Sequence, residues 1–209
     1  MKATWLIEEL IRRGIGHFAG VPDSTLSQFC KCQEQKYAAI HEVPANEGAA
    51  VALAAGHYLA EQTISAVYMQ NSGIGNAVNP ICSLIHEKVY RIPVLFLVGW
   101  RGEPGIKDEP QHVFQGEVTI PLLNQLGIPC QVMGKETSQD DMMHILDEAW
   151  TALSQRKPYA IVVKKGSFEK ESLEMKSSRW DIRFGTEVPY RMKREDAIGL
   201  FVSQLRPED

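Results

Sequence analysis

The sequence has no excess of basic residues and no long apolar segment. Lys and Arg total 22 against 26 Asp and Glu, for a formal net charge of −4, and no segment has the basic density that a phosphate backbone requires. The longest apolar run, residues 92–100, is far shorter than the ~20 residues that cross a bilayer. The amphipathic first ten residues are unlike a signal peptide. We therefore expect neither a nucleic-acid partner nor a membrane partner.

Cysteine is also scarce, which bears on compartment and on metal binding. The four cysteines, Cys30, Cys32, Cys82 and Cys130, occur without a secretory signal, and we expect reduced thiols in the cytoplasm. Cys30 and Cys32 are too close for an ordinary zinc clip and have no second pair to complete one. The sequence therefore predicts no metal ligands in this chain.

Helical and strand patterns alternate along the chain, which predicts a doubly wound α/β fold with a mainly parallel sheet and helices on both faces. The continuous apolar run at 92–98 is typical of a central strand covered on both sides. Residues 99–116 are rich in Gly, Pro and charge, and are predicted to form a long loop. The predicted helices are 3–13, 24–35, 47–60, 77–87, 118–126 and 139–154, and the predicted strands are 17–22, 38–43, 64–70, 92–98, 128–132 and 159–164.

The charge pattern predicts where the first domain ends. Charged residues make up 19 of the 46 residues from Lys164 onward, against 29 of the 163 before it. We therefore predict one domain over residues 1–168 and a charged linker over 169–193. An apolar stripe at helical spacing predicts a terminal helix within 194–209. Its apolar face needs a cover, either on this domain or in a further domain that this chain lacks.

Two features could carry chemistry. Gly73 and Gly75 lie between a predicted strand and helix, but the third glycine of a dinucleotide site and the Gly-Lys-Ser/Thr of a P-loop are absent. These glycines form either a simple tight turn or a set of N–H donors facing a polar or anionic ligand. Glu47 opens an otherwise apolar helix. It either caps that helix or has a polar partner from outside, since burying an unpaired carboxylate is costly.

Several segments, in the same order along residues 1–168, resemble the thiamine diphosphate enzymes. Residues 47–58 resemble the Glu-x-x-Ala-x-x-x-Ala-x-Gly-Tyr helix of the pyrimidine-binding domain, with His57 inserted before the tyrosine. Residues 71–75 resemble its Thr-Ser-Gly-Pro-Gly turn and residues 114–116 its Phe-Gln-Glu. Within this family, the sequence resembles the phosphonopyruvate and sulfopyruvate decarboxylases more specifically. The segments that carry this resemblance are 20–24, 46–48, 75–80, 99–102 and 108–112.

The resemblance implies a decarboxylase that uses thiamine diphosphate and Mg²⁺ to convert phosphonopyruvate to phosphonoacetaldehyde and carbon dioxide. A sulfopyruvate decarboxylase α subunit and a non-catalytic domain with the same fold are the alternatives. In this family the glutamate hydrogen-bonds the aminopyrimidine ring and favours its imino tautomer, a role that falls to Glu47. Ser72, Gly73 and Gln115 are the further cofactor-binding residues that the resemblance implies.

The diphosphate side of the family's cofactor site is missing. The Gly-Asp-Gly segment that holds magnesium and diphosphate occurs nowhere in the sequence. We therefore expect a diphosphate-binding domain or subunit as partner, in a homo-oligomer, and an inactive isolated chain. The chain is either the amino-terminal piece of a longer decarboxylase or a separate subunit.

A phosphono or sulfo group on the substrate needs a cation and hydrogen-bond donors. Arg101 can bind such oxygens in a bidentate way, or it is a solvated loop arginine. Ser24, with Asp23 beside it, can contribute a hydroxyl group, although either side chain can instead cap the next helix. His112 can move a proton at the product, or it is an exposed loop histidine. Asn71 and Asn79 are also predicted to contact substrate, although asparagines are common in turns.

Overall fold

The computed structural model describes residues 1–172 and 193–204. The chain divides into two units, Met1–Met175 and Lys176–Asp209. In the second unit the described element is one helix, α7 (Arg194–Gln204). In the part of the chain that the structure describes, no helix has the length and apolar character needed to span a bilayer.

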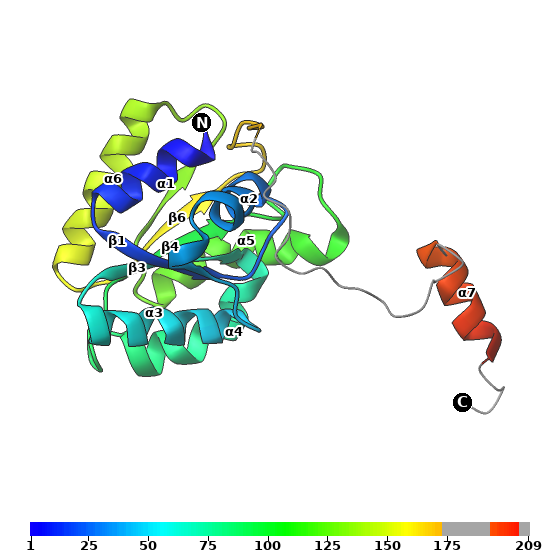
Figure 1. Cartoon of the computed structure of the whole chain (residues 1–209), viewed down its shortest axis with the longest axis horizontal. Coiled ribbons are helices and arrows are strands. Elements are labelled where there is room, and N and C mark those ends of the chain that lie inside the picture. The colour runs from blue at the N-terminus through cyan, green and yellow to red at the C-terminus, as the bar shows by residue number, and fades with distance from the viewer. Residues whose placement is uncertain (173–192, 205–209) are drawn as a thin grey trace. The chain divides into compact units, whose positions relative to one another are not determined.

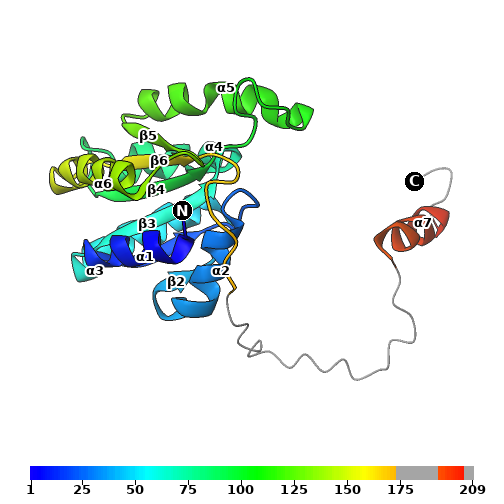
Figure 2. The ribbon, with the colours of Figure 1, turned by 90° about the horizontal axis from the view of Figure 1, so that it is seen from above.

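The first unit is built on one sheet of six parallel strands. The strands are β1 (Ile15–Gly20), β2 (His41–Glu42), β3 (Ile64–Gln70), β4 (Val94–Gly99), β5 (Cys130–Met133) and β6 (Tyr159–Val163). Their order across the sheet is β2-β1-β3-β4-β6-β5, and every neighbouring pair is parallel. Figure 2 labels β5, β6, β4, β3 and β2 in this order. The prediction of a parallel α/β sheet is confirmed.

Helices cover both faces of this sheet, because successive strand residues point to opposite sides and both sets are apolar. On one face α1 (Ala3–Arg12), α2 (Ser27–Lys36) and α6 (Gln139–Ser154) pack on strand residues such as Phe18, Leu95 and Ile161. On the other face α3 (Glu47–Glu61), α4 (Ile74–Pro80) and α5 (Pro110–Gln125) pack on residues such as Val67 and Phe96. Figure 1 shows α1 and α6 on one side of the strands and α3 and α4 on the other.

The largest differences between prediction and structure concern three segments, while other predicted elements are shifted at their ends by a few residues. The predicted strand at 38–43 is a 3₁₀ turn (Ala38–Ile40) followed by the two-residue β2. The predicted helix at 77–87 begins earlier, as α4, and continues as a π-helical turn, Ile81–Ile85. The predicted loop at 99–116 is wrong in its second half, because α5 begins at Pro110. A proline fits the first position of a helix, whose N–H has no intrahelical partner.

The first unit continues past the predicted domain end at residue 168. The amino group of Met1 donates to Ser167 O at 3.1 Å and pairs with Glu169 at 3.0 Å. Thr4 Oγ1 donates to Glu171 Oε2 at 2.6 Å. These contacts tie residues 167–171 to the start of α1. Most of the predicted linker, 169–193, lies outside the described residues.

Candidate active site

The predicted site residues lie mainly after the carboxyl ends of β1, β3 and β4. The chain leaves β1 toward β2 on one side and leaves β3 toward β4 on the other, so the connections diverge between β1 and β3. In open α/β sheets, ligands bind beyond the carboxyl ends of the strands at such a switch point. Asp23 and Ser24 follow β1, Asn71–Gly75 follow β3, and Trp100–Asp108 follow β4.

Glu47 is buried at the first position of α3 and does not cap that helix. The cap is Asn46, whose Oδ1 accepts from Ala49 N at 2.9 Å. The Glu47 side chain instead faces α4, where its Oε2 accepts from Asn76 Nδ2 at 2.7 Å. Glu47 is only 9% exposed. Glu47 therefore does not cap α3 but has a polar partner, Asn76, on another helix.

The glycines of this region allow α3 and the turn after β3 to approach each other. A Cβ at Gly73 would lie 2.5 Å from Glu47 Oε1, and a Cβ at Gly48 would lie 2.8 Å from Asn76 O. Real Cβ atoms essentially never come this close, so the Glu47 carboxylate occupies space that only glycine leaves free at 73. Ser72, next to it, is exposed, and its hydroxyl oxygen accepts from Gln70 Nε2 at 2.9 Å.

Asn71 is fully buried and connects the end of β3 to the segment after β4. Its Nδ2 donates to Arg101 O at 2.8 Å and to Thr119 Oγ1 at 2.8 Å, and its Oδ1 accepts from Arg101 N at 3.2 Å. Gln115 Nε2 donates to the Asn71 carbonyl at 3.4 Å. The Asn71 amide is thus occupied by protein partners and positions the Arg101 backbone. Thr119 was not predicted, since its role depends on a residue 48 positions away.

Arg101 is paired within its own segment. Its Nε donates to Asp108 Oδ2 at 2.8 Å and its Nη2 donates to Oδ1 at 2.5 Å. Hydrogen bonds from Arg101, and then from the backbone N–H groups of Gly102 and Glu109, hold the pKa of Asp108 well below its usual range. The same pairing raises the pKa of Arg101. Arg101 is therefore not a freely solvated loop arginine, and Asp108 is a partner that the sequence analysis did not identify.

Two predicted substrate residues lie close to this pair. Ser24 is exposed, and its Oγ accepts from Arg101 Nη1 at 3.5 Å. Asp23 is 7% exposed, and its Oδ2 accepts from Leu26 N at 3.1 Å, so Asp23 orders the turn before α2. A Cβ at Gly99 would lie 2.3 Å from Asp23 Oδ2, which places this carboxylate against the end of β4. Among the described residues, Asp23 Oδ1 has no hydrogen-bond partner.

The remaining predicted residues lie on helices. His112 is half-buried in the first turn of α5, where its backbone N–H donates to Glu109 O at 2.9 Å. Its predicted loop position is therefore wrong. Asn79 is exposed on α4, and its Oδ1 accepts from Ser83 Oγ at 3.1 Å. Among the described residues, Asn79 makes no hydrogen bond to Glu47 or Arg101.

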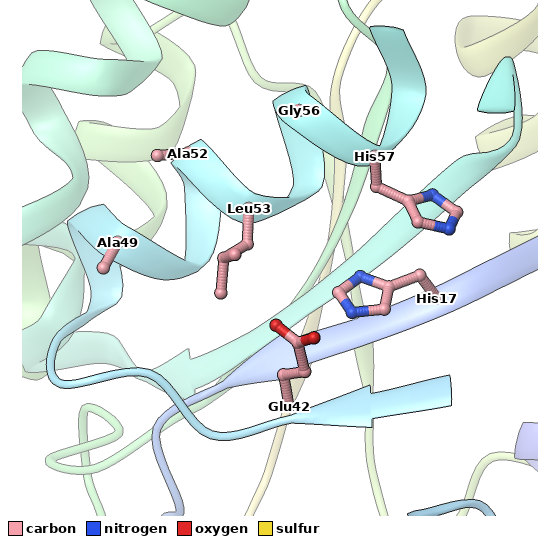
Figure 3. Close-up of a pocket in the computed structure, with 7 residues that line it drawn as sticks. All are labelled: His17, Glu42, Ala49, Ala52, Leu53, Gly56 and His57. Carbon is pink, nitrogen blue, oxygen red and sulfur yellow. The ribbon is translucent and has the colours of Figure 1, made fainter. Parts of the chain in front are cut away.

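A groove of about 530 Å³ lies along the exposed side of α3. Figure 3 shows the His17 ring between the His57 ring and the Glu42 carboxylate, with Ala49, Ala52, Leu53 and Gly56 of α3 along the groove. The two histidine rings stack with centroids 4.8 Å apart, and burial, followed by the charge of His57, lowers the pKa of His17. None of the predicted site residues lines this groove.

Comparison with known proteins identifies the fold and the family. Residues 2–126 match the family model described as thiamine pyrophosphate enzyme, N-terminal TPP binding domain. Two solved structures share the fold: a thiamine diphosphate-dependent 4-hydroxybenzoylformate decarboxylase from Rhodococcus jostii and a benzoylformate decarboxylase from Polynucleobacter necessarius. The first has a TM-score of 0.59 at 20% identity and covers 82% of this chain and 31% of its own. The second has a TM-score of 0.60 at 19% identity and covers 86% of this chain and 33% of its own.

Curated relatives match most of this chain. A phosphonopyruvate decarboxylase from Streptomyces hygroscopicus is 33% identical over 180 residues, which are 86% of this chain and 44% of the relative. Another, from Streptomyces viridochromogenes, is 35% identical over 83% of this chain and 43% of the relative. A sulfopyruvate decarboxylase α subunit from Methanococcus maripaludis is 28% identical over 74% of this chain and 89% of the relative. The chain thus spans less than half the length of the two phosphonopyruvate decarboxylases. It belongs to the thiamine pyrophosphate (thiamine diphosphate) enzyme family, with the family's N-terminal TPP-binding domain in residues 2–126.

Proposed function

We propose that this chain supplies the pyrimidine side of the active site in a thiamine diphosphate-dependent decarboxylase that converts phosphonopyruvate to phosphonoacetaldehyde and carbon dioxide. The observation that carries the proposal is the Glu47 carboxylate, which is buried, faces away from its own backbone, and is fixed by Asn76 on a neighbouring helix. The relatives named for phosphonopyruvate support the choice of substrate.

The residues around Glu47 fit the pyrimidine part of the cofactor. Asn76 is bonded to Oε2, and among the described hydrogen bonds Oε1 accepts none, so Oε1 is available to a ligand nitrogen. Because residue 73 is glycine, the carboxyl group can pack directly against the turn after β3. Low local polarity strengthens a hydrogen bond between a buried carboxyl group and a heterocycle. We propose that Glu47 holds the ring through Oε1, with Gly73, Ser72 and Gln115 lining the site. When bound, thiamine diphosphate supplies the nucleophilic carbon and the electron sink for decarboxylation.

Other side chains of this chain would bind the substrate and transfer a proton. Arg101 and Ser24 bind the phosphonate oxygens, since a guanidinium group and a hydroxyl group can donate to a compact anion. Asp23 and Asn71 keep the loops that carry these donors in place. His112, at the start of α5, exchanges a proton with the reacting carbon or with the product oxygen. Asn79 remains a candidate for the outer part of the substrate pocket.

The diphosphate side of the active site belongs to a partner in this proposal. The sequence contains no Gly-Asp-Gly segment, so we propose that Mg²⁺ and the diphosphate are held by a second domain or subunit within a homo-oligomeric enzyme. In this proposal residues 1–168 are the pyrimidine-binding domain, 169–193 are a linker whose first residues pair with the start of α1, and 194–209 are the region that leads to this partner. The four free thiols favour a cytoplasmic enzyme.

One observation favours a second candidate. The α subunit of a sulfopyruvate decarboxylase from Methanococcus maripaludis is matched over 89% of its length, so a subunit of this general size exists among the relatives. In that case the chain would act on sulfopyruvate, together with a separate partner subunit. A sulfonate offers the same tetrahedral arrangement of oxygens to Arg101 and Ser24.

The test is an assay of the enzyme assembled with its diphosphate-binding half. Phosphonopyruvate, sulfopyruvate and pyruvate are each supplied with thiamine diphosphate and Mg²⁺, and aldehyde formation is measured. The proposal predicts the highest kcat/KM with phosphonopyruvate. A higher value with sulfopyruvate would select the second candidate, and no turnover with any substrate would favour a non-catalytic domain that retains the fold.

A further inference from the structure

Arg101 is held at both its backbone and its guanidinium group. Asn71 accepts from Arg101 N at 3.2 Å and donates to Arg101 O at 2.8 Å. Asp108 accepts from Nε at 2.8 Å and from Nη2 at 2.5 Å, which is side-on bidentate pairing. A solvated arginine has many rotamers to lose when it binds a ligand. Here the protein has already restricted them.

Asp108 is itself fixed in position. Its Oδ2 accepts from Gly102 N at 2.9 Å, and its Oδ1 accepts from Glu109 N at 2.8 Å. The carboxylate therefore receives four hydrogen bonds, two from the guanidinium group and two from the backbone. The side chain is only 14% exposed, and that of Arg101 only 20%. Both partners of the pair are thus anchored to the segment between β4 and α5.

This pairing leaves one edge of the guanidinium group available. A guanidinium group has five N–H donors, and the Asp108 pair uses one on Nε and one on Nη2. Among the described residues, the one further acceptor is the exposed Ser24 hydroxyl, at a long 3.5 Å from Nη1. The end-on edge is formed by the two terminal nitrogens, of which Nη1 lies within reach of Ser24 Oγ. It presents parallel donors of the kind that a tetrahedral oxyanion accepts.

We propose that Asp108 is a positioning residue for anion recognition: it holds Arg101 side-on, so that the end-on edge and Ser24 together receive the phosphonate group of the substrate. This inference rests on the function proposed above and assigns how that site selects an anionic substrate. A carboxylate beside an anion site repels the anion. The pairing therefore favours binding only if orienting Arg101 outweighs that repulsion.

Orientation of Arg101 and repulsion of the anion change the KM for phosphonopyruvate in opposite directions when Asp108 is replaced. In the assembled enzyme, Asp108→Asn removes the negative charge and the strong bidentate pairing. If orientation dominates, KM for phosphonopyruvate rises roughly tenfold while kcat changes little. KM for pyruvate, which lacks the phosphonate group, stays nearly constant. If Asp108 acts only through its charge, KM for phosphonopyruvate falls instead.

Glu109→Gln is the matched control. Glu109 is adjacent, and its charge also raises the pKa of Arg101, but among the described residues its carboxylate makes no hydrogen bond to the guanidinium group. The substitution removes the same charge without releasing Arg101. We expect KM for phosphonopyruvate to stay the same or to fall. A rise equal to that of Asp108→Asn would overturn the proposal, because the effect would then follow charge alone.

Repeating the Asp108→Asn substitution in an Arg101→Ala enzyme distinguishes a positioning role from general damage to the segment between β4 and α5. If Asp108 acts through Arg101, then Asp108→Asn adds little to the KM of an Arg101→Ala enzyme. Equal losses with phosphonopyruvate and pyruvate, or fully additive effects of the two substitutions, would refute the positioning role.

Binding measured without turnover separates this proposal from the proposed function. Phosphonoacetate, an unreactive compound that carries both carboxylate and phosphonate groups, is titrated calorimetrically into the assembled enzyme. A Kd that rises roughly tenfold in Asp108→Asn supports the positioning role even if phosphonopyruvate is not decarboxylated. An unchanged or lower Kd overturns it, whatever the activity.

Discussion

Replacing Gly73 with alanine tests whether the Glu47 carboxylate is held where the proposed function needs it. The new Cβ would lie 2.5 Å from Glu47 Oε1 and 2.6 Å from its Cδ and Cγ, whereas carbon atoms in contact are about 3.5–4.0 Å apart. The carboxyl group must therefore move by about 1 Å. A misplacement of that size at a catalytic group costs roughly 10²-fold in rate, and we expect kcat/KM to fall by about that factor.

The fold should survive this substitution, because the crowded atoms belong to the end of a side chain that can turn away. The main loss is the bond from Asn76 Nδ2 to Glu47 Oε2, at 2.7 Å. A hydrogen bond to a charged group contributes roughly 1.5–3 kcal/mol. For a chain of this size each kcal/mol lowers Tm by roughly 2–4 °C. The variant should therefore remain folded at 25 °C while losing most of its activity.

Gly75→Ala is the control for this experiment. Gly75 lies two residues further along, in α4, and a Cβ there meets no atom within 4 Å. Alanine is also the better helix former, so this variant should keep its kcat/KM and its Tm. The measurements are decarboxylation of phosphonopyruvate by the assembled enzyme and thermal unfolding followed by circular dichroism. Normal activity in Gly73→Ala, or an equal loss in Gly75→Ala, would refute the reasoning.

Three further predictions follow from single residues. Glu47→Gln should abolish turnover with an unchanged circular dichroism spectrum, and near-normal activity would exclude the role proposed for this carboxylate. Burial, followed by the charge of His17, lowers the pKa of His41 from 6.5 to about 4. The unfolded chain therefore takes up a proton first, and stability should fall as the pH drops from 6.5 to about 4, by up to about 1.4 kcal/mol per pH unit. His41→Gln should flatten this dependence in urea unfolding at different pH values. Gly116→Ala would place a Cβ 1.7 Å from the Gly102 carbonyl oxygen. Because the Cβ position is fixed by its own backbone and the carbonyl group is itself backbone, neither can turn away, and Tm should drop; an unchanged Tm would contradict the close packing of this loop.

Elements were predicted correctly where the sequence signals that define them lie within the element or next to it. The predicted bounds of β3 (Ile64–Gln70) and α6 (Gln139–Ser154) agree with the structure. The first is a β-branched and apolar run between polar turns, and the second begins after Ser138, whose side chain accepts from Asp141 N. In both cases the residues that define the element lie within it or next to it.

The start of α5 was missed because two local signals conflicted. Gly116 and the Gly, Pro and charged residues before it favour a loop, while Pro110 fits the first position of a helix. The structure explains Gly116 through a distant contact, since the Gly102 backbone occupies the space of any Cβ at 116. A glycine required by tertiary packing is indistinguishable, in a single sequence, from one that interrupts a helix.

The same limit applies to the candidate site. Glu47 and Arg101 were singled out from their residue type and from a family resemblance, but the hydrogen bonds that hold them in place were not predicted. Asn76 is 29 positions from Glu47, and Asn71 is 30 positions from Arg101. No periodicity within one helix or strand connects such residues. Asp108 is only seven positions from Arg101, yet the turn that brings them together has no regular pattern.

Two of these partners, Asn71 and Asn76, belong to one segment, Asn71–Asn76, which joins the two halves of the proposed site. Its first residue clamps the backbone of Arg101, its third leaves space for the Glu47 carboxylate, and its last donates to that carboxylate. The distance between the proposed cofactor side and the proposed anion side is therefore set by six consecutive residues at the end of a buried strand. Because β3 is paired on both sides, by β1 and β4, this segment cannot shift without disturbing the sheet. Glu47 and Arg101 are thus held in a fixed relation, as a reaction between a bound cofactor and a bound anion requires.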